Sequence, residues 1–273
     1  MSVDGERLIP EGLEATLVLL RHGESEHIVR GLFQGQAETP LSTIGRRQAA
    51  LAAERLARPD RSPTLPVPIR PPHEIVHSPL GRAADTATAL CQTLAAAGTP
   101  TPIRPDPAFL EIAQGEWEGR PHTEIAERWG DVLAGWRRSP TEHWAPGGES
   151  LAQVQARVRQ GLTTILAPLA EGRPRADIDR LQVDGYRVAA PADHPWSVIV
   201  GHDGVFKVLL LTLFDLPLER FWMFTFALCA ISVVDFGAGR PILRAHNLTE
   251  HLAPLLDARA AEVAEQRART GAL

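Results

Sequence analysis

The sequence predicts an α/β layer fold with a largely parallel sheet, and two observations carry that prediction. Short apolar stretches of strand length recur along the 273 residues, and stretches with apolar residues at helical spacing alternate with them. Strands that alternate with helices favour a parallel sheet, because each helix carries the chain back to the edge where the next strand starts. The hydrophobic content of 44% is enough for the core of one large domain.

The predicted strands are Ala15–Leu20, Glu74–His77, Thr101–Arg104, Ser197–Val200 and Ile231–Phe236, with Arg240–Ala245 as an edge partner. The first of them, "ATLVLL", is an unbroken run of mostly apolar residues. Such a run is typical of a strand that is buried on both faces.

The predicted helices are Gly45–Ala57, Pro79–Ala97, Leu151–Leu169 and Lys207–Leu213. Pro79 suits the first turn of its helix, where no N–H is needed. The "GGES" before Leu151 offers a cap and an acidic start.

Three stretches interrupt this alternation. Residues 58–72 are rich in Pro and Arg and are expected to be solvated, and residues 171–195 are expected to be a surface insertion. Residues 112–149 form a region of short helices whose tryptophans are expected to pack it onto the sheet edge: Trp117, Trp129, Trp136 and Trp144. No second domain boundary is evident, so residues 1–273 are expected to form a single domain.

Composition excludes several classes of function. A net charge of −5 and a pI near 6.1 argue against nucleic acid or an anionic membrane as a partner. Cys91 and Cys229 lie in apolar surroundings without metal-like spacing, which favours a reduced compartment. Residues 1–14 lack the pattern of a signal peptide, and the longest apolar stretch is shorter than the ~20 residues of a membrane span. A soluble cytoplasmic protein is therefore expected.

Cations and histidines gather where the predicted strands end. Arg21 and His22 close the first strand, Arg82 follows the second in "HSPLGR", and His202 follows the fourth in "GHDG". In open α/β sheets, ligands bind beyond the carboxyl ends of the strands. These side chains are therefore candidates for one common site.

Five ordered motifs, "RHGES", "SPLGRAADTA", "LEIAQGEWEG", "PGGES" and "VIVGHDG", resemble the histidine phosphatase superfamily, the phosphoglycerate-mutase-like proteins. The resemblance runs from about Leu17 to Phe236. It implies a three-layer α/β/α, Rossmann-like core with a helical cap inserted at about residues 112–149. It also implies a phosphohistidine mechanism with neither metal nor other cofactor.

The residue roles agree with elementary phosphoryl chemistry. A transferring phosphoryl group carries charge on three oxygens, which the planar cations of Arg21 and Arg82 can each engage. His202 would be a further donor when protonated. His22 is the candidate nucleophile, since a neutral imidazole nitrogen can attack phosphorus. The resemblance implies that the backbone at Gly23 holds its other nitrogen.

Glu111 matches the general acid/base position of the family. It would protonate the leaving group and later deprotonate water, provided that burial or neighbours raise its pKa toward neutrality. Glu116 and Glu118 are its competitors, and Glu118 is expected to hold the base of the cap.

Ser25, Gln34 and Gly35 are further candidates for contact with phosphate or substrate. Two positions depart from the pattern of the family. Ile28 stands where many relatives have asparagine, and Asp203 stands where many have glycine. An acid at 203 would disfavour an additional anionic group or would orient a neighbouring cation.

Three functions remain open at this level. A phosphatase is favoured over a cofactor-dependent phosphoglycerate mutase, because the stretch after Glu111 lacks the tyrosine and lysine of true mutases, and the single tyrosine is Tyr186. A non-catalytic protein that binds a phosphorylated ligand is less favoured, because no motif residue is lost. The expected partners are a small phosphorylated metabolite and, as an open alternative to a monomer, a second copy in a homodimer.

Overall fold

The computed structural model describes residues 7–171, 182–183, 186–187 and 193–256. Within them, a six-stranded sheet has the strand order β3-β2-β6-β1-β7-β8. The strands are β1 (Ala15–Arg21), β2 (Ile75–His77), β3 (Ile103–Pro105), β6 (Trp196–Gly201), β7 (Ile231–Gly237) and β8 (Arg240–Leu248). The first four in spatial order are parallel, whereas β7 is antiparallel to β1 and β8 is antiparallel to β7. The sheet is thus mixed and mostly parallel.

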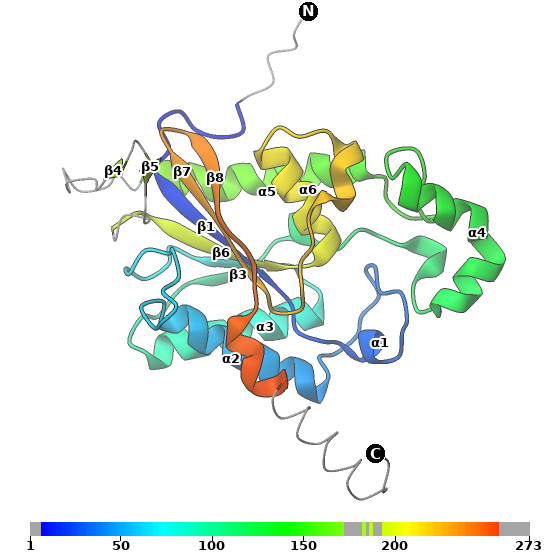
Figure 1. The fold of residues 1–273 in the computed structure, drawn as a ribbon, viewed down its shortest axis with the longest axis horizontal. Coiled ribbons are helices and arrows are strands. Elements are labelled where there is room, and N and C mark those ends of the chain that lie inside the picture. The colour runs from blue at the N-terminus through cyan, green and yellow to red at the C-terminus, as the bar shows by residue number, and fades with distance from the viewer. Residues whose placement is uncertain (1–6, 172–181, 184–185, 188–192, 257–273) are drawn as a thin grey trace, which may run out of the picture.

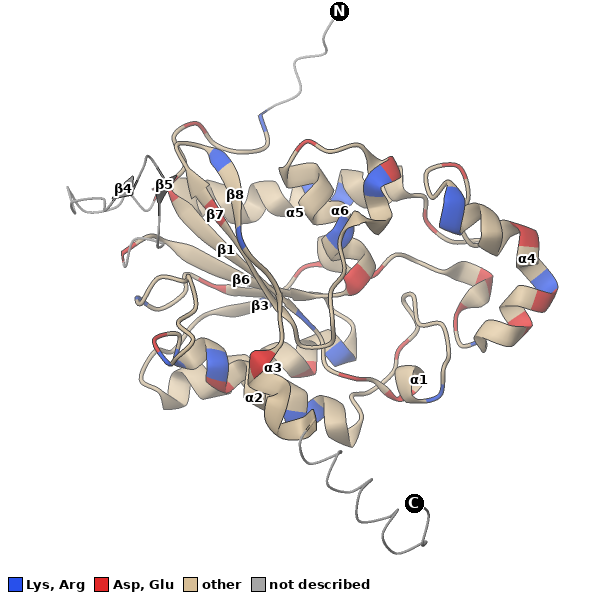
Figure 2. Ribbon diagram, in the orientation of Figure 1, with Lys and Arg blue, Asp and Glu red and all other residues tan. Residues whose placement is uncertain are grey.

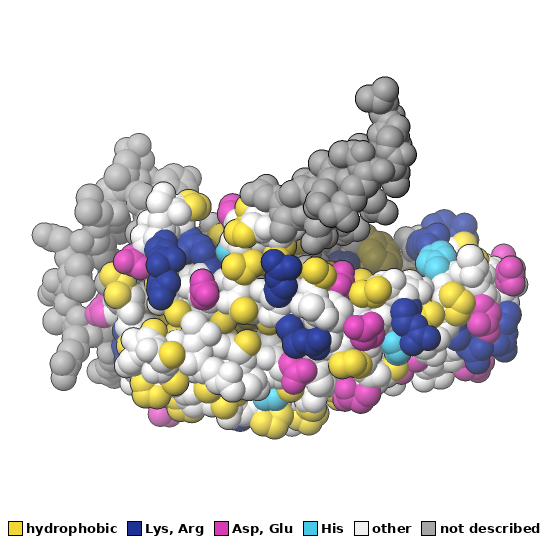
Figure 3. Space-filling model, turned by 90° about the horizontal axis from the view of Figure 1, so that it is seen from below, with side chains coloured by type: hydrophobic (Ala, Val, Ile, Leu, Met, Phe, Trp, Pro, Cys, Tyr) yellow, Lys and Arg dark blue, Asp and Glu magenta, His cyan; other side chains and the backbone are white. Residues whose placement is uncertain are grey.

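Helices cover both faces of this sheet, which gives three layers (Figure 1). One face carries α2 (Thr43–Ala57) and α3 (Gly81–Ala96), and the other carries α5 (Leu151–Glu171) and α6 (Asp203–Leu213). Charged residues lie mainly on helices and loops (Figure 2), and on the face that carries α2 and α3 both signs are interspersed (Figure 3).

The position of β1 in the middle of the sheet explains its apolar sequence. Leu17 and Leu19 enter the core cluster under α5 and α6, while Val18 and Leu20 enter the cluster under α2 and α3. Because helices cover both faces of the sheet, β1 cannot alternate apolar and polar residues as a half-exposed strand does. Its apolar run is therefore continuous.

The predicted strands all occur, but three helices begin elsewhere than expected. Helix α2 starts at Thr43 rather than Gly45, because Ser42 caps it and accepts the Gly45 N–H. Helix α3 starts at Gly81 after an extended Leu80, so the placement of Pro79 in its first turn is wrong. Helix α6 starts at Asp203 rather than Lys207, because the polar "DG" that hid its start from the apolar pattern forms its first turn. The cap expected from "GGES" is present: Ser150 accepts the N–H of Gln153, whose side chain accepts the N–H of Ser150.

The chain between β3 and α5 projects from the sheet. It contains η1 (Pro107–Phe109), η2 (Gly115–Trp117) and α4 (His122–Arg138), and α4 is the outermost of them (Figure 1). Of its tryptophans, Trp117 and Trp136 are buried and Trp129 packs partly buried, as expected. The expectation is wrong for Trp144, which is 39% exposed.

The other interrupting stretches differ. In residues 58–72 the arginines are exposed as predicted, but Leu65 and Val67 enter the core cluster under α2 and α3, so the loop is anchored. Of the predicted surface insertion, Glu171 is the last residue of α5. Beyond it, β4 (Gln182–Val183), β5 (Tyr186–Arg187) and residues 193–195 are described, and the rest lies outside the described residues. None of the described helices is long and apolar enough to cross a membrane.

Candidate active site

The register of the sheet brings three of the predicted site segments together. Arg21 pairs with Gly201 across β1 and β6, and His77 pairs with Val200 across β2 and β6. The His22 N–H then donates to the Gly201 carbonyl at 3.0 Å. The carboxyl ends of three adjacent strands are therefore level, as the sequence predicted.

His22 is held as a neutral imidazole with a defined tautomer. Its Nδ1 lies 2.6 Å from the Gly23 carbonyl, which can only accept, so Nδ1 carries the proton. Burial, and then the cations of Arg21 and Arg82, hold the pKa of His22 well below its ordinary value. Nε2 is thereby the ring nitrogen with a free lone pair.

His202 lies beside it, with 5.0 Å between the ring centroids. Its Nε2 is 2.8 Å from Ser78 Oγ, which also accepts the N–H of Leu80 at 3.4 Å. When the Ser78 hydroxyl donates to Nε2, the ring proton of His202 lies on Nδ1. Burial, and then His22 and the two arginines, hold the pKa of His202 well below its ordinary value. A neutral His202 can therefore donate from Nδ1, without the protonation that the sequence argument required.

Arg21 and Arg82 are anchored by backbone carbonyls. The Arg21 guanidinium donates to the Phe226 carbonyl, and Arg82 donates to those of Gly35 and Ala37 at 2.7 and 3.0 Å. Arg82 is fully buried, and this burial lowers its pKa from the ordinary value.

Three nitrogens at this edge lack a hydrogen-bond partner among the described residues. They are Arg21 Nε, Arg82 Nε and His202 Nδ1, and all are buried. Buried donors without partners are costly in a folded protein. An anion bound between them would satisfy them, which is what a phosphate site requires.

The loop after β1 holds the weaker candidates. Ser25 caps α1 (Glu26–Val29), and its hydroxyl donates to the Gln34 side-chain oxygen at 2.6 Å. Gly35 has a positive φ of 51° and offers its carbonyl to Arg82. In this structure these residues shape the loop around Arg82, and Ile28 is partly buried on the same short helix.

Glu111 meets the first turn of α6. Its Oε1 accepts the N–H groups of Ile112 and Val205 at 2.9 and 3.0 Å, and its Oε2 accepts that of Gly204 at 3.1 Å. Gly204 is two residues beyond His202, and the Glu111 charge acts on Arg82 against the lowering of its pKa, so this carboxyl group lies at the same edge of the sheet.

The competing carboxylates lie elsewhere. Glu116 is exposed, and Glu118 Oε1 accepts the N–H groups of Gln36 and Gln114 at 2.9 and 2.8 Å. Glu118 therefore ties the loop after β1 to the base of the projecting region, the position that the sequence analysis favoured.

Sequence reasoning missed the support of Glu111. Arg157 of α5 donates to the Glu111 carbonyl at 3.1 Å and forms an ion pair with Glu149 at 2.9 Å. The side-chain amide of Gln36 donates to the same two acceptors, the Glu111 carbonyl and the Glu149 carboxylate. The available signal was a charged residue three positions after Val154 on the apolar face of the helix. Ser78, the partner of His202, carried no signal of its own.

Asp203, the departure noted in the sequence, orients a cation. Its Oδ2 lies 2.7 Å from Lys207 Nζ, one turn further along α6. Among the described residues, no group of three or more His, Cys, Asp or Glu side chains could hold a metal ion.

Comparison with known proteins places this geometry in context. A family profile described as "Histidine phosphatase superfamily (branch 1)" matches residues 17–173 and 183–249. Glucosyl-3-phosphoglycerate phosphatase of Mycobacterium tuberculosis (strain ATCC 25618 / H37Rv) is 36% identical over 206 residues, which cover 75% of this chain and 77% of that protein. Phosphoserine phosphatase 1 of Hydrogenobacter thermophilus is 29% identical over 239 residues, 86% of this chain and 93% of its own.

A solved structure agrees with these sequence matches. The mycobacterial glucosyl-3-phosphoglycerate phosphatase in complex with VO3 superimposes with a TM-score of 0.67 at 30% identity, covering 86% of this chain and all of that one.

Proposed function

The chain belongs to the histidine phosphatase superfamily and is a phosphoric monoester hydrolase, and we propose that it works through a phosphohistidine on His22 without a metal ion. The observation that carries the proposal is the 2.6 Å contact between His22 Nδ1 and the Gly23 carbonyl. A nucleophilic imidazole needs one nitrogen held as a donor and the other left with a lone pair. His22 has this arrangement at a low pKa, so it is neutral at physiological pH.

In the first step, the Nε2 lone pair of His22 forms a bond to phosphorus while the ester P–O bond breaks. The ring becomes a phosphorylated imidazolium, which keeps its proton on Nδ1 and donates it in a hydrogen bond to the Gly23 carbonyl. Arg21, Arg82 and the Nδ1–H of His202 donate to the three peripheral oxygens, where the charge of the transition state lies. The loop after β1 lies beside this phosphate, and its wall is formed by Ser25, Gln34 and Gly35.

The departing alkoxide takes a proton from Glu111. Both acceptor directions of Oε1 are occupied by backbone N–H groups, whereas Oε2 accepts only one. Oε2 is therefore the oxygen with room to carry the proton that is transferred. In the second step, water gives a proton to this oxygen and attacks phosphorus, the N–P bond breaks, and its electron pair returns to Nε2.

The substrate is proposed to be a small phosphorylated metabolite of the cytoplasm. The relatives act, by name, on glucosyl-3-phosphoglycerate and phosphoserine, so both esters belong in a first substrate panel. We further propose that the whole chain is one domain, with residues of about 112–149 as a cap over the site.

The decisive experiment traps the intermediate. Brief incubation with a ³²P-labelled substrate should leave label on His22 that is labile to acid and stable to alkali. His22→Ala should lose the label and about 10³-fold or more of the rate, because the covalent route is lost. The exposed His73 offers a matched control, and His73→Ala should keep both. Label on a serine, or an active His22→Ala, would exclude this mechanism.

A further inference from the structure

We propose that Asp203, Lys207 and Trp222 form a site for the leaving group of the substrate, and that this site selects a neutral leaving group with adjacent hydroxyls, as in a polyol or a sugar. The inference rests on the proposed function, since the leaving group is the part of the phosphomonoester that lies outside the phosphate site.

Asp203 lies at the rim of the phosphate site. Its Oδ1 accepts the Phe226 N–H at 3.2 Å, and the Arg21 guanidinium donates to the carbonyl of the same residue. Asp203 thus binds the N–H of Phe226 and Arg21 binds its carbonyl. The two side chains therefore lie within about one residue's length of each other. Asp203 also follows His202 directly in the chain. A group esterified to a phosphate held by Arg21 and His202 would thus lie beside the Asp203 carboxylate.

This carboxylate has acceptor capacity left. Oδ1 accepts from Phe226 and Oδ2 from Lys207, and each carboxylate oxygen has two lone pairs. One acceptor direction therefore remains on each oxygen, and the side chain is 31% exposed. Two adjacent acceptors match two hydroxyl groups on neighbouring carbon atoms.

The charge of Asp203 is already compensated. Lys207 Nζ lies 2.7 Å away on a side chain that is only 7% exposed, so water screens this pair little. An ammonium substituent would compete with Lys207 for the same oxygens, and a carboxylate would meet the negative side of the pair. Hydroxyl groups donate without either conflict.

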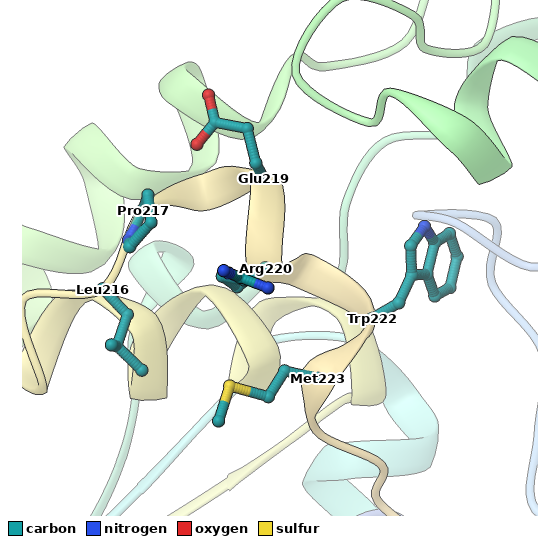
Figure 4. Close-up of a pocket in the computed structure, with 6 residues that line it drawn as sticks. All are labelled: Leu216, Pro217, Glu219, Arg220, Trp222 and Met223. Atoms are coloured by element: carbon teal, nitrogen blue, oxygen red, sulfur yellow. The ribbon is translucent and has the colours of Figure 1, made fainter.

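Trp222, on η3 (Leu218–Met223), supplies an apolar face. Its ring is 5.1 Å from Lys207 Nζ and is fixed edge-on against Phe221 and against Trp136 of α4. It remains 44% exposed, and the close-up shows its indole directed away from Leu216 and Pro217 (Figure 4). The face of an aromatic ring is negative and attracts the C–H groups of a sugar or polyol. Since Trp136 belongs to the proposed cap, the cap helps to hold the Trp222 ring in place.

A neighbouring pocket is the alternative location for the leaving group. It has a volume of about 680 Å³ and is lined by Leu216, Pro217, Glu219, Arg220, Trp222 and Met223 (Figure 4). Glu219 is its carboxylate, and Figure 4 shows it pointing away from Trp222. Glu219→Gln is therefore the matched control for Asp203→Asn.

The test compares glycerol 1-phosphate with n-propyl phosphate, which differ only in two adjacent hydroxyls. The native enzyme should favour glycerol 1-phosphate by about 10- to 100-fold in kcat/KM, the range expected for hydrogen bonds to a charged acceptor. Asp203→Asn should bring this ratio close to one, and Glu219→Gln should not change it. Lys207→Met frees the charge of Asp203, so the kcat/KM of phosphoethanolamine, whose leaving group carries an ammonium and no carboxylate, should rise about tenfold relative to that of glycerol 1-phosphate.

Three results would overturn the proposal. The first is a ratio near one in the native enzyme, a comparison that needs no folded variant. The second is a loss of the ratio in Glu219→Gln but not in Asp203→Asn, which would place the leaving group in the neighbouring pocket. The third is unchanged selectivity in folded Lys207→Met. Hydrolysis of p-nitrophenyl phosphate in the same preparations separates these results from failure of the phosphatase itself, in which no ester would react.

Discussion

The oxygen atoms of Glu111 are not equivalent, and the difference assigns them separate tasks. Oε1 is fixed by two backbone N–H groups and orients the carboxyl group, while Oε2 keeps one open direction for a proton. His22 shows the same division, with Nδ1 fixed on Gly23 and Nε2 open. At the scale of single residues, the proposed mechanism thus uses one atom of each side chain for orientation and the other for chemistry.

Substitution of Glu111 separates these tasks. Glu111→Gln keeps an acceptor for the backbone but cannot protonate an alkoxide. Transfer to His22 should slow by roughly 10²–10⁴-fold for alkyl phosphates and less for p-nitrophenyl phosphate, whose leaving group needs little protonation. Single-turnover measurements are required, because the second step also uses this residue. Equal losses for both classes would direct attention to Glu116 or Glu118.

At the scale of elements, the first turn of α6 organises the site. His202 precedes the helix as its N-cap residue, Asp203 opens the helix, and the next two N–H groups hold Glu111. Gly204 is required because a Cβ there would lie 2.6 Å from Glu111 Oε1 and 2.8 Å from the Ile112 side chain. The four consecutive residues "HDGV" thereby supply the His202 side chain, the Asp203 carboxylate at the rim of the site, and the two N–H groups that hold Glu111.

Replacement of Gly204 should therefore mimic loss of the acid. Gly204→Ala should lower the rate with alkyl phosphates by about 10²-fold and spare aryl phosphates more, because the added methyl group displaces the Glu111 carboxyl group. The control is Gly130→Ala in α4, where an added Cβ meets nothing within 4 Å, and which should stay within twofold. A fully active Gly204→Ala enzyme would contradict the position assigned to Glu111.

The elements also show what the sequence could and could not predict. Strand β1 was evident from the sequence because a strand that is buried on both faces consists of a continuous apolar run. The start of α6 was not, because its first two residues were selected for contacts across the site rather than for periodicity. The roles of Ser78 and Arg157 were equally hidden, since each depends on a partner 124 or 46 residues away in the chain.

At the scale of the whole molecule, the proposed mechanism uses positive charge in place of a metal ion. Arg21 and Arg82 come from different elements, yet both lie at the end of one sheet, held by carbonyls of the loop after β1 and of the chain before β7. Their unsatisfied Nε donors, together with His202, offer what a cation would offer to phosphate oxygens.

Removal of metal should consequently leave the rate unchanged within about twofold. The measurement is the hydrolysis of p-nitrophenyl phosphate after exhaustive dialysis against a chelator, compared with untreated enzyme and with enzyme given back Mg²⁺ or Zn²⁺. Activity that disappears on dialysis and returns with either ion would contradict the assignment of this role to the arginines.

The pairing of β1 has a consequence for synthesis of the chain. This central strand is complete at Arg21, yet its neighbours are β6 and β7, and Thr16 pairs with Trp196, 180 residues later. At a ribosomal rate of about 5–20 residues per second, both edges of the most apolar strand wait roughly 10–40 s for their partners. An unpaired apolar strand invites association with other chains. The nascent protein should therefore depend on chaperones until β6 and β7 have emerged, even though the finished molecule buries β1 from Ala15 to Leu20.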